Sequence, residues 1–240
     1  MKIIIANWKS NPRNVKLAKA LAKVTDLSSN RIKLVIAPPD TFLEDVGNIL
    51  KKASLGAQDV FWADSGAYTG EVSIKQLKSL KVKYVIIGHS ERRKFLKETD
   101  KLINKKIKAS LKAGFKVILC IGEWQRHSLA KAKIFVKSQI RKDLDGVKNY
   151  KNLIIAYEPV WAISTNKSGK SDRPEDAVEM AKFIKQSLVI SHKLPVKVLY
   201  GGSVTYKNAK SFLRQKEIDG ALVGGASLIP KDFKKIVQSV

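Results

Sequence analysis

The fold of this chain is decided by the stretch Leu153-Ile154-Ile155-Ala156-Tyr157-Glu158-Pro159-Val160-Trp161-Ala162-Ile163. Its first five residues form a short, continuous apolar run, which is typical of a parallel strand covered on both faces. A carboxylate, Glu158, follows where that strand should end. Pro159 favours extended backbone at the preceding residue, so the chain leaves the strand sharply. The stretch therefore predicts a buried strand with a fixed carboxylate at its end, although a strand-end glutamate facing solvent is the plainer alternative.

Similar apolar runs recur along the whole chain. Besides the run above, they are Ile3–Ala6, Leu34–Ala37, a weaker Leu55–Val60, Tyr84–Ile87, Val117–Cys120, Val196–Tyr200 and Ala221–Val223. Helical periodicity lies between them, as where Ile103, Ile107 and Leu111 recur at intervals of four. Pro174 stands where the first turn of a later helix should begin.

The alternation of eight strands with helices over 240 residues predicts parallel strands joined by right-handed crossovers. This number of units fits a (β/α)8 barrel, commonly called a TIM barrel, better than an open doubly wound sheet. No linker, repeat or low-complexity tract divides the chain. We therefore expect residues 1–240 to form a single α/β domain whose active site lies at the carboxyl ends of the strands.

Composition limits the class of protein. Hydrophobic residues make up 44% of the chain and charged residues 28%, as in soluble globular proteins. No run approaches the roughly 18 apolar residues of a spanning helix, so no membrane partner is expected. Cys120 is the only cysteine, which rules out an intrachain disulfide or a cysteine-based metal cluster and favours the reducing cytoplasm.

The formal charge of +25, from 46 basic and 21 acidic residues, is extreme. A basic surface can bind nucleic acid, but here the lysines are dispersed at helix-like spacing, as at Lys101, Lys105, Lys108 and Lys112, without a basic tail. We interpret them mainly as solvated helix faces, with no nucleic-acid partner. The positive field would nevertheless speed the encounter with an anionic substrate.

Polar side chains follow several of the predicted strands. Asn7 and Lys9 follow the first, His89 the fourth and Glu158 the sixth. Ser90-Glu91 resembles the start of a short helix, whose positive end favours a neutral imidazole at His89. Taken singly, each has a plainer interpretation: a structural histidine, one more surface lysine, or an asparagine that caps a turn.

Two glycine-rich turns follow the seventh and eighth strands. They contain Gly201-Gly202-Ser203-Val204 and Gly224-Gly225-Ala226-Ser227, and each should open a helix. Exposed backbone N–H groups at such turns bind phosphate, and barrels often place a phosphate site after strands seven and eight. Either turn alone is a weak signal, but both at the expected position predict a phosphate site.

These groups together suit proton abstraction beside a carbonyl in a small phosphorylated molecule. Glu158 would remove a carbon-bound proton, while Lys9 and His89 would stabilise the enediolate oxygens. Return of the proton to the neighbouring carbon would complete an isomerisation. This chemistry requires neither a metal nor an organic cofactor, and a closing loop would protect the intermediate from water.

The chain resembles the triosephosphate isomerases along essentially its whole length. Seven motifs in order carry the resemblance: Ala6-Asn7-Trp8-Lys9, the stretch from Ala57-Gln58 through Gly66-Ala67-Tyr68-Thr69-Gly70-Glu71, Ile87-Gly88-His89-Ser90-Glu91-Arg92-Arg93, Cys120-Ile121-Gly122-Glu123, Ala156-Tyr157-Glu158-Pro159-Val160-Trp161-Ala162-Ile163, Tyr200-Gly201-Gly202-Ser203-Val204 and Leu222-Val223-Gly224-Gly225-Ala226-Ser227-Leu228. The resemblance implies interconversion of dihydroxyacetone phosphate and D-glyceraldehyde 3-phosphate in glycolysis and gluconeogenesis.

The resemblance also implies roles for single residues. Glu158 matches the catalytic base, His89 the electrophile, and Asn7 and Lys9 the substrate-binding pair. Phosphate-binding amides are implied at Ser164, Ser203, Gly224 and Gly225. A homodimer is implied too, in which the loop Gly66–Glu71, with Thr69 near its tip, docks beside Lys9 of the partner.

The departures from the family pattern are concentrated in the loop that should close over the substrate. This chain has Ala162-Ile163-Ser164-Thr165-Asn166 where the family usually has Ala-Ile-Gly-Thr-Gly, and the segment up to Pro174 is about three residues longer than usual. Glycine alone adopts positive φ cheaply, so we expect altered closing kinetics of the segment Ser164–Ser171 with the chemistry retained. Ser10 stands where the family often has Met, which predicts a smaller apolar contact in the dimer.

Two alternatives remain at this point. Another phosphate-binding barrel enzyme, such as an aldolase or an indole-forming enzyme, would share the fold and the glycine turns. A basic nucleic-acid-binding protein is suggested by charge alone.

Overall fold

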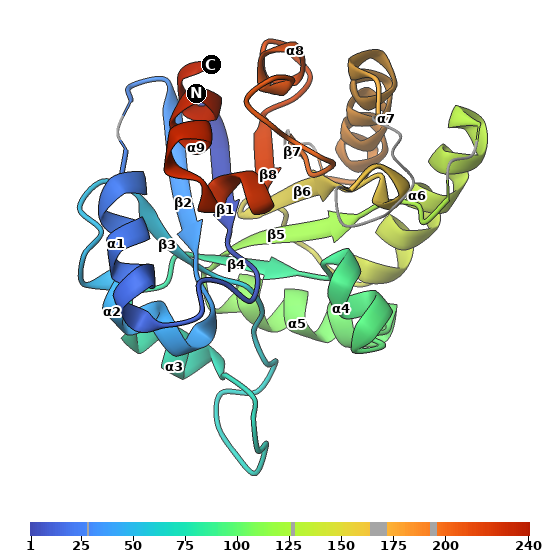
Figure 1. The fold of residues 1–240 in the computed structure, drawn as a ribbon. Helices are drawn as coiled ribbons and strands as arrows, with labels where there is room; N and C mark the ends of the chain where they lie inside the picture. The colour runs from blue at the N-terminus through green and yellow to red at the C-terminus, as the bar shows by residue number, and fades with distance from the viewer. Residues whose placement is uncertain (28, 126–127, 164–171, 193–195) are drawn as a thin grey trace.

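Eight parallel strands close into a barrel in the computed structural model (Figure 1). The structure describes residues 1–27, 29–125, 128–163, 172–192 and 196–240. The strands are β1 (Lys2–Asn7), β2 (Ile32–Ala37), β3 (Ser54–Ala57), β4 (Tyr84–Ile87), β5 (Lys116–Ile121), β6 (Leu153–Tyr157), β7 (Lys197–Tyr200) and β8 (Gly220–Val223). Each pairs with the next in chain order, and β8 pairs with β1. The predicted (β/α)8 barrel is therefore confirmed.

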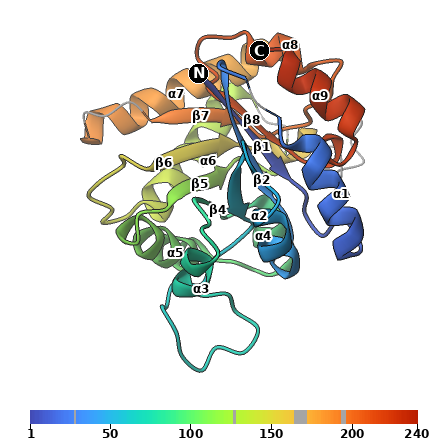
Figure 2. The same ribbon diagram turned by 90° about the vertical axis from the view of Figure 1, so that its left-hand side faces the viewer.

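Helices cover the outside of the barrel (Figures 1 and 2). The described α-helices are α1 (Val15–Thr25), α2 (Leu43–Gly47), α3 (Ile74–Ser79), α4 (Ser90–Phe95), α5 (Asp100–Lys112), α6 (Leu129–Asp143), α7 (Pro174–His192), α8 (Ala209–Leu213) and α9 (Pro230–Gln238). Short 3-10 helices are η1 (Asp40–Phe42), η2 (Val160–Ala162) and η3 (Gly225–Leu228). Pro174 is the first residue of α7, as predicted, and Ile103 and Ile107 on α5 are fully buried.

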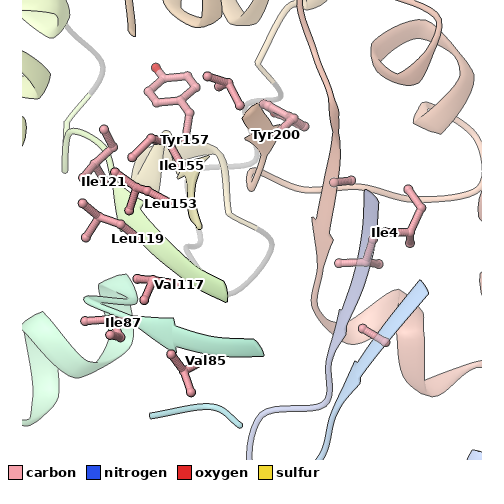
Figure 3. Close-up of a cluster of buried hydrophobic side chains, with 14 of the residues drawn as sticks. Ile4, Val85, Ile87, Val117, Leu119, Ile121, Leu153, Ile155, Tyr157 and Tyr200 are labelled. Carbon is pink, nitrogen blue, oxygen red and sulfur yellow. The ribbon is translucent and has the colours of Figure 1, made fainter. Parts of the chain in front are cut away.

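Alternate residues of each strand face two separate cores. On β5, Ile118 and Cys120 join the cluster that fills the barrel, whereas Leu119 and Ile121 join the larger cluster beneath the helices. Figure 3 shows part of this outer cluster, in which Leu119 lies between Ile87 on β4 and Ile155 on β6. Because both faces are buried, the strands appear in the sequence as continuous apolar runs.

Two element boundaries differ from the prediction. β3 ends at Ala57, three residues before the end of its apolar run, because Gln58 and Asp59 turn to distant partners. The amide of Gln58 donates to the Lys9 carbonyl at 2.8 Å, and Asp59 accepts hydrogen bonds from Lys106. The turn after β7 does not open a helix directly, since α8 begins only at Ala209; the turn after β8 leads at once into η3.

The chain between β3 and α3 forms a long loop that projects away from the barrel (Figures 1 and 2). Residues 64–71 are all exposed. Inside the loop, the Tyr68 ring packs on Phe61 with centroids 4.4 Å apart, and Tyr68 N donates to the Gly66 carbonyl at 3.0 Å. The loop therefore has internal support although it extends into solvent.

Among the described helices, none combines the length and the apolar character needed to cross a membrane.

Candidate active site

Glu158 lies directly after β6, in the mouth of the barrel, with only 2% of its side chain exposed. Its backbone is fixed to the neighbouring strand because Glu158 N donates to the Ile121 carbonyl at 2.8 Å. Its carboxylate accepts a hydrogen bond from Ser90 N at 3.1 Å and lies 3.1 Å from Nε2 of His89. The predicted base is therefore a buried, oriented carboxylate and not a solvated one.

Glu158 occupies space that is free because two neighbouring residues are glycines without side chains. A Cβ on Gly122 would lie 1.8 Å from the Glu158 carbonyl oxygen, and one on Gly201 would lie 2.8 Å from Cγ of Glu158. Gly122 is itself held by its N–H, which donates to Oε1 of Gln139 at 2.9 Å. The motifs containing these glycines were visible in the sequence, but their role in seating the carboxylate was not, because it depends on contacts across β5, β6 and β7.

Cys120 lies in the barrel interior, close to this carboxylate. Burial, and then the negative charge of nearby Glu158, raise the pKa of the Cys120 thiol well above its ordinary value. The thiol therefore stays protonated, and its S–H interacts with the Glu158 carboxylate.

His89 is the N-cap residue of α4. Its Nδ1 accepts a hydrogen bond from Glu91 N at 3.3 Å, which leaves Nδ1 without a proton. The neutral ring then carries its proton on Nε2, which points at Glu158. The short helix expected at Ser90 is confirmed. The hydrogen bond at Nδ1 also identifies the tautomer of His89, which could not be inferred from the sequence.

Lys9 has a strained backbone, with φ of 53°. Non-glycine residues adopt this region at a cost of roughly 1–3 kcal/mol, and such residues cluster at functional sites. Two side chains hold it there: Lys9 N donates to Oδ1 of Asn7 at 3.0 Å, and Gln58 donates to the Lys9 carbonyl. Gln58 is a supporting residue whose role was not predicted.

The ammonium of Lys9 enters the site from β1. Its Nζ lies 2.5 Å from Oε1 of Glu91, so the charge is paired with that carboxylate. A Cβ on Gly224 would come within 3.3 Å of Cε of Lys9, so this glycine gives the lysine room.

A cavity of about 420 Å³ opens among these groups. Seven of the eight predicted site residues line it: Asn7, Lys9, His89, Glu158, Ser203, Gly224 and Gly225. The eighth, Ser164, lies outside the described residues, as does the predicted closing segment Ser164–Ser171. The structure thus gathers residues from β1, β4, β6, β7 and β8 around one volume.

The two glycine turns are fixed by local hydrogen bonds. The side chain of Asn208 donates to the Ser203 carbonyl at 2.9 Å and accepts from Thr205 N at 2.8 Å. Ser227 donates to the Gly224 carbonyl at 2.7 Å. The turns therefore present preformed backbone to the cavity, on the side contributed by β7 and β8.

The chain leaving Glu158 is anchored by a buried carboxylate. Glu123 accepts from Nε1 of Trp161 at 2.7 Å and from the Tyr157 hydroxyl at 3.1 Å. Burial first, and then the charge of Glu123, raise the pKa of Tyr157. The sharp exit from the strand that was predicted after Glu158 is followed by η2. Among the described residues, no group of three His, Cys, Asp or Glu side chains could hold a metal ion.

Residues 2–240 match the family model described as triosephosphate isomerase. The chain belongs to the triosephosphate isomerase family. It is 43% identical over 251 aligned residues to the triosephosphate isomerase of Dictyoglomus thermophilum, with 99% of each chain covered. It is 41% identical to that of Caldanaerobacter subterraneus subsp. tengcongensis over 246 residues, with 98% of each covered. The enzyme of Finegoldia magna is 43% identical over 250 residues, covering 98% of this chain and 97% of the relative.

Proposed function

We propose that this chain is an isomerase that interconverts dihydroxyacetone phosphate and D-glyceraldehyde 3-phosphate, a step of glycolysis and gluconeogenesis. The observation that carries the proposal is the convergence of a buried carboxylate, an imidazole N–H and an ammonium on one cavity of about 420 Å³, in a member of this family. An aldolase or an indole-forming barrel is disfavoured because the family match covers residues 2–240.

Glu158 is the catalytic base in this proposal. Its carboxylate takes a proton from the carbon beside the carbonyl, which yields an enediolate, and returns it to the neighbouring carbon. Nε2 of His89 gives its proton to the developing oxyanion and takes up the hydroxyl proton of the neighbouring oxygen, so that one carbonyl is lost as the other forms, and the ammonium of Lys9 offsets the negative charge. The substrate oxygens would replace present partners, namely Glu158 for the imidazole and Glu91 for the ammonium.

The phosphate of the substrate is assigned to the glycine turns. Backbone N–H groups at Ser203, Gly224 and Gly225 would bind its oxygens, because successive amides at such turns form a concave anion site. Ser164 is proposed as a fourth donor. Because the phosphate would be bound in the cavity away from Glu158, the reacting carbons would be held beside the carboxylate.

Hydrogen isotope exchange tests the reaction directly. With dihydroxyacetone phosphate in deuterium oxide, we expect deuterium on carbon in the recovered triose phosphates, because the proton held by Glu158 exchanges with solvent before its return. Mass spectrometry or proton NMR measures the incorporation. Interconversion without carbon-bound deuterium would argue against a carboxylate relay, and absence of interconversion would rule out the assigned activity.

We also propose a homodimer formed through the loop Gly66–Glu71. Its support is a projecting, internally packed loop in which Tyr68 is 45% exposed and Thr69 is exposed as well. Thr69→Arg should raise the dimer dissociation constant at least about tenfold, because a buried unpaired charge at an interface costs at least 2 kcal/mol. Sedimentation equilibrium over a range of concentrations measures it.

The control for the dimer is Ser211→Arg, which adds the same charge at an exposed position on α8. It should leave the dissociation constant unchanged. A parent chain that stays monomeric at every concentration, or equal constants for both variants, would refute this interface. We place the dimer in the cytoplasm, given the single cysteine, and treat the whole chain as one barrel domain.

A further inference from the structure

Besides Lys2 in β1, three lysines lie on the strands and not on helix faces. They are Lys33 in β2, Lys116 at the start of β5 and Lys197 at the start of β7. Each stands two residues before a member of the barrel-interior cluster: Val35, Ile118 and Leu199 respectively. Because side chains on a strand alternate between faces, all three lysines occupy positions of the inward-facing set. They therefore ring the axis at the amino-terminal mouth of the barrel, opposite the candidate active site.

A cavity of about 420 Å³ opens at this mouth. Lys33, Lys116, Lys151 and Lys197 line it, and none of its lining residues is acidic. None of the four ammonium groups forms an ion pair with a residue that the structure describes. Four uncompensated positive charges thus surround one hollow, which raises the local concentration of anions.

Tyr84 supplies a neutral hydrogen-bond donor at the floor of this cavity. The residue is 2% exposed, and its hydroxyl oxygen accepts from Nζ of Lys116 at 3.4 Å. Within the described part of the chain, its own O–H proton has no acceptor. A buried hydroxyl without an acceptor favours a ligand oxygen at this position.

A second cavity, of about 580 Å³, adjoins the first. The two share Lys151 and Asn152, and the second adds Lys108, Lys112 and Lys148 to its lining without a carboxylate. The basic surface is therefore elongated and concave. Such a shape suits a chain of phosphates better than a single phosphate, and a small anion better than a wide duplex.

We propose that the amino-terminal mouth of the barrel binds a small polyphosphate anion, with a linear triphosphate as the recognised group. Lys33, Lys116 and Lys197 would bind its oxygens around the barrel axis, Tyr84 would donate one hydrogen bond, and Lys151 would extend the site outward. Free inorganic tripolyphosphate and a nucleoside triphosphate both carry this group.

Thermal unfolding with inorganic tripolyphosphate tests the proposal. At about a hundredfold excess over its dissociation constant, the anion should raise the melting temperature of the parent by roughly 5–10 °C relative to sodium chloride of equal ionic strength. The combined variant K33Q/K116Q/K197Q should lose most of this increase. Its matched control, K101Q/K137Q/K234Q, removes the same charge from exposed positions on α5, α6 and α9 and should keep it. Equal increases in parent, variant and control would overturn the proposal, because binding at the candidate active site contributes alike to all three.

Isomerase kinetics verify that the variants are folded, and we expect kcat/KM within about twofold of the parent because the mouth lies at the other end of the barrel. If the triple variant does not fold, the single variants Lys116→Gln and Lys197→Gln test the proposal, and their affinity for tripolyphosphate is measured by phosphorus NMR titration. Each should weaken tripolyphosphate binding at least about threefold, and unchanged affinity in both would overturn the site. If ATP also raises the melting temperature and the increase needs the same lysines, the triphosphate that binds can be that of a nucleotide. An equal increase with a short DNA duplex would contradict a site for a small anion.

Discussion

Replacing Glu158 with glutamine is expected to lower kcat by at least about a hundredfold, the least that a general base usually contributes. The amide has nearly the volume of the carboxylate, and its oxygen can still accept from Ser90 N, so the side chain should keep its place. It cannot accept a carbon-bound proton at neutral pH. Steady-state assays in both directions should therefore show a fall in kcat with KM within about threefold of the parent.

Glu44→Gln is the matched control, because it makes the same chemical change at an exposed position on α2. It should have parental kinetics. A Glu158→Gln variant that retains more than about a hundredth of the parental kcat, or that loses activity only through KM, would contradict the role of Glu158 as the base.

The strands could be predicted because parallel strands in a barrel are buried on both faces. Tyr84–Ile87 and Leu153–Tyr157 were predicted to the residue. The strand predicted over the weaker run Leu55–Val60 was too long at its carboxyl end. Gln58 and Asp59 leave the strand because each is bonded to a residue far away in the sequence, namely Lys9 and Lys106. Strand boundaries set by distant partners leave no local signal.

The polar residues at the strand ends could be placed for a related reason. The carboxyl ends of parallel strands meet at one face, so order along the chain is enough to bring Lys9, His89 and Glu158 together. The distances and the histidine tautomer required the structure. The support of Lys9 by Gln58 could not be predicted either, because that contact depends on how two loops are folded.

The burial of individual lysines was the feature that the sequence predicted least well. The helical lysines Lys101, Lys105 and Lys137 are exposed, as expected of solvated faces. Lys106, however, is only 2% exposed and lies 2.6 Å from Asp59 and 2.5 Å from Glu98. Its spacing on α5 resembles that of its exposed neighbours, and only the position of both carboxylates explains its burial.

Gly122→Ala is expected to lower kcat by about a hundredfold, although Gly122 carries no side chain and donates no group to the substrate. A Cβ at this position would lie 1.8 Å from the Glu158 carbonyl oxygen and 2.5 Å from its carbonyl carbon. Those atoms are backbone and cannot rotate aside, so β6 must move by more than about 1 Å at the point where it positions the Glu158 carboxylate. A displacement of this size typically lowers the rate by two orders of magnitude.

Overpacking should also cost roughly 1–3 kcal/mol of unfolding free energy. The turns proposed to bind the phosphate follow β7 and β8, so KM should change far less than kcat. Gly47→Ala on α2 is the control, since its Cβ would meet the flexible end of Leu55 at 3.0 Å and the Leu80 carbonyl oxygen at an ordinary contact distance of 3.9 Å, and it should leave kcat unchanged. If Gly122→Ala had kcat within about threefold of the parent at a temperature where circular dichroism shows it folded, the seating of Glu158 would not depend on this contact.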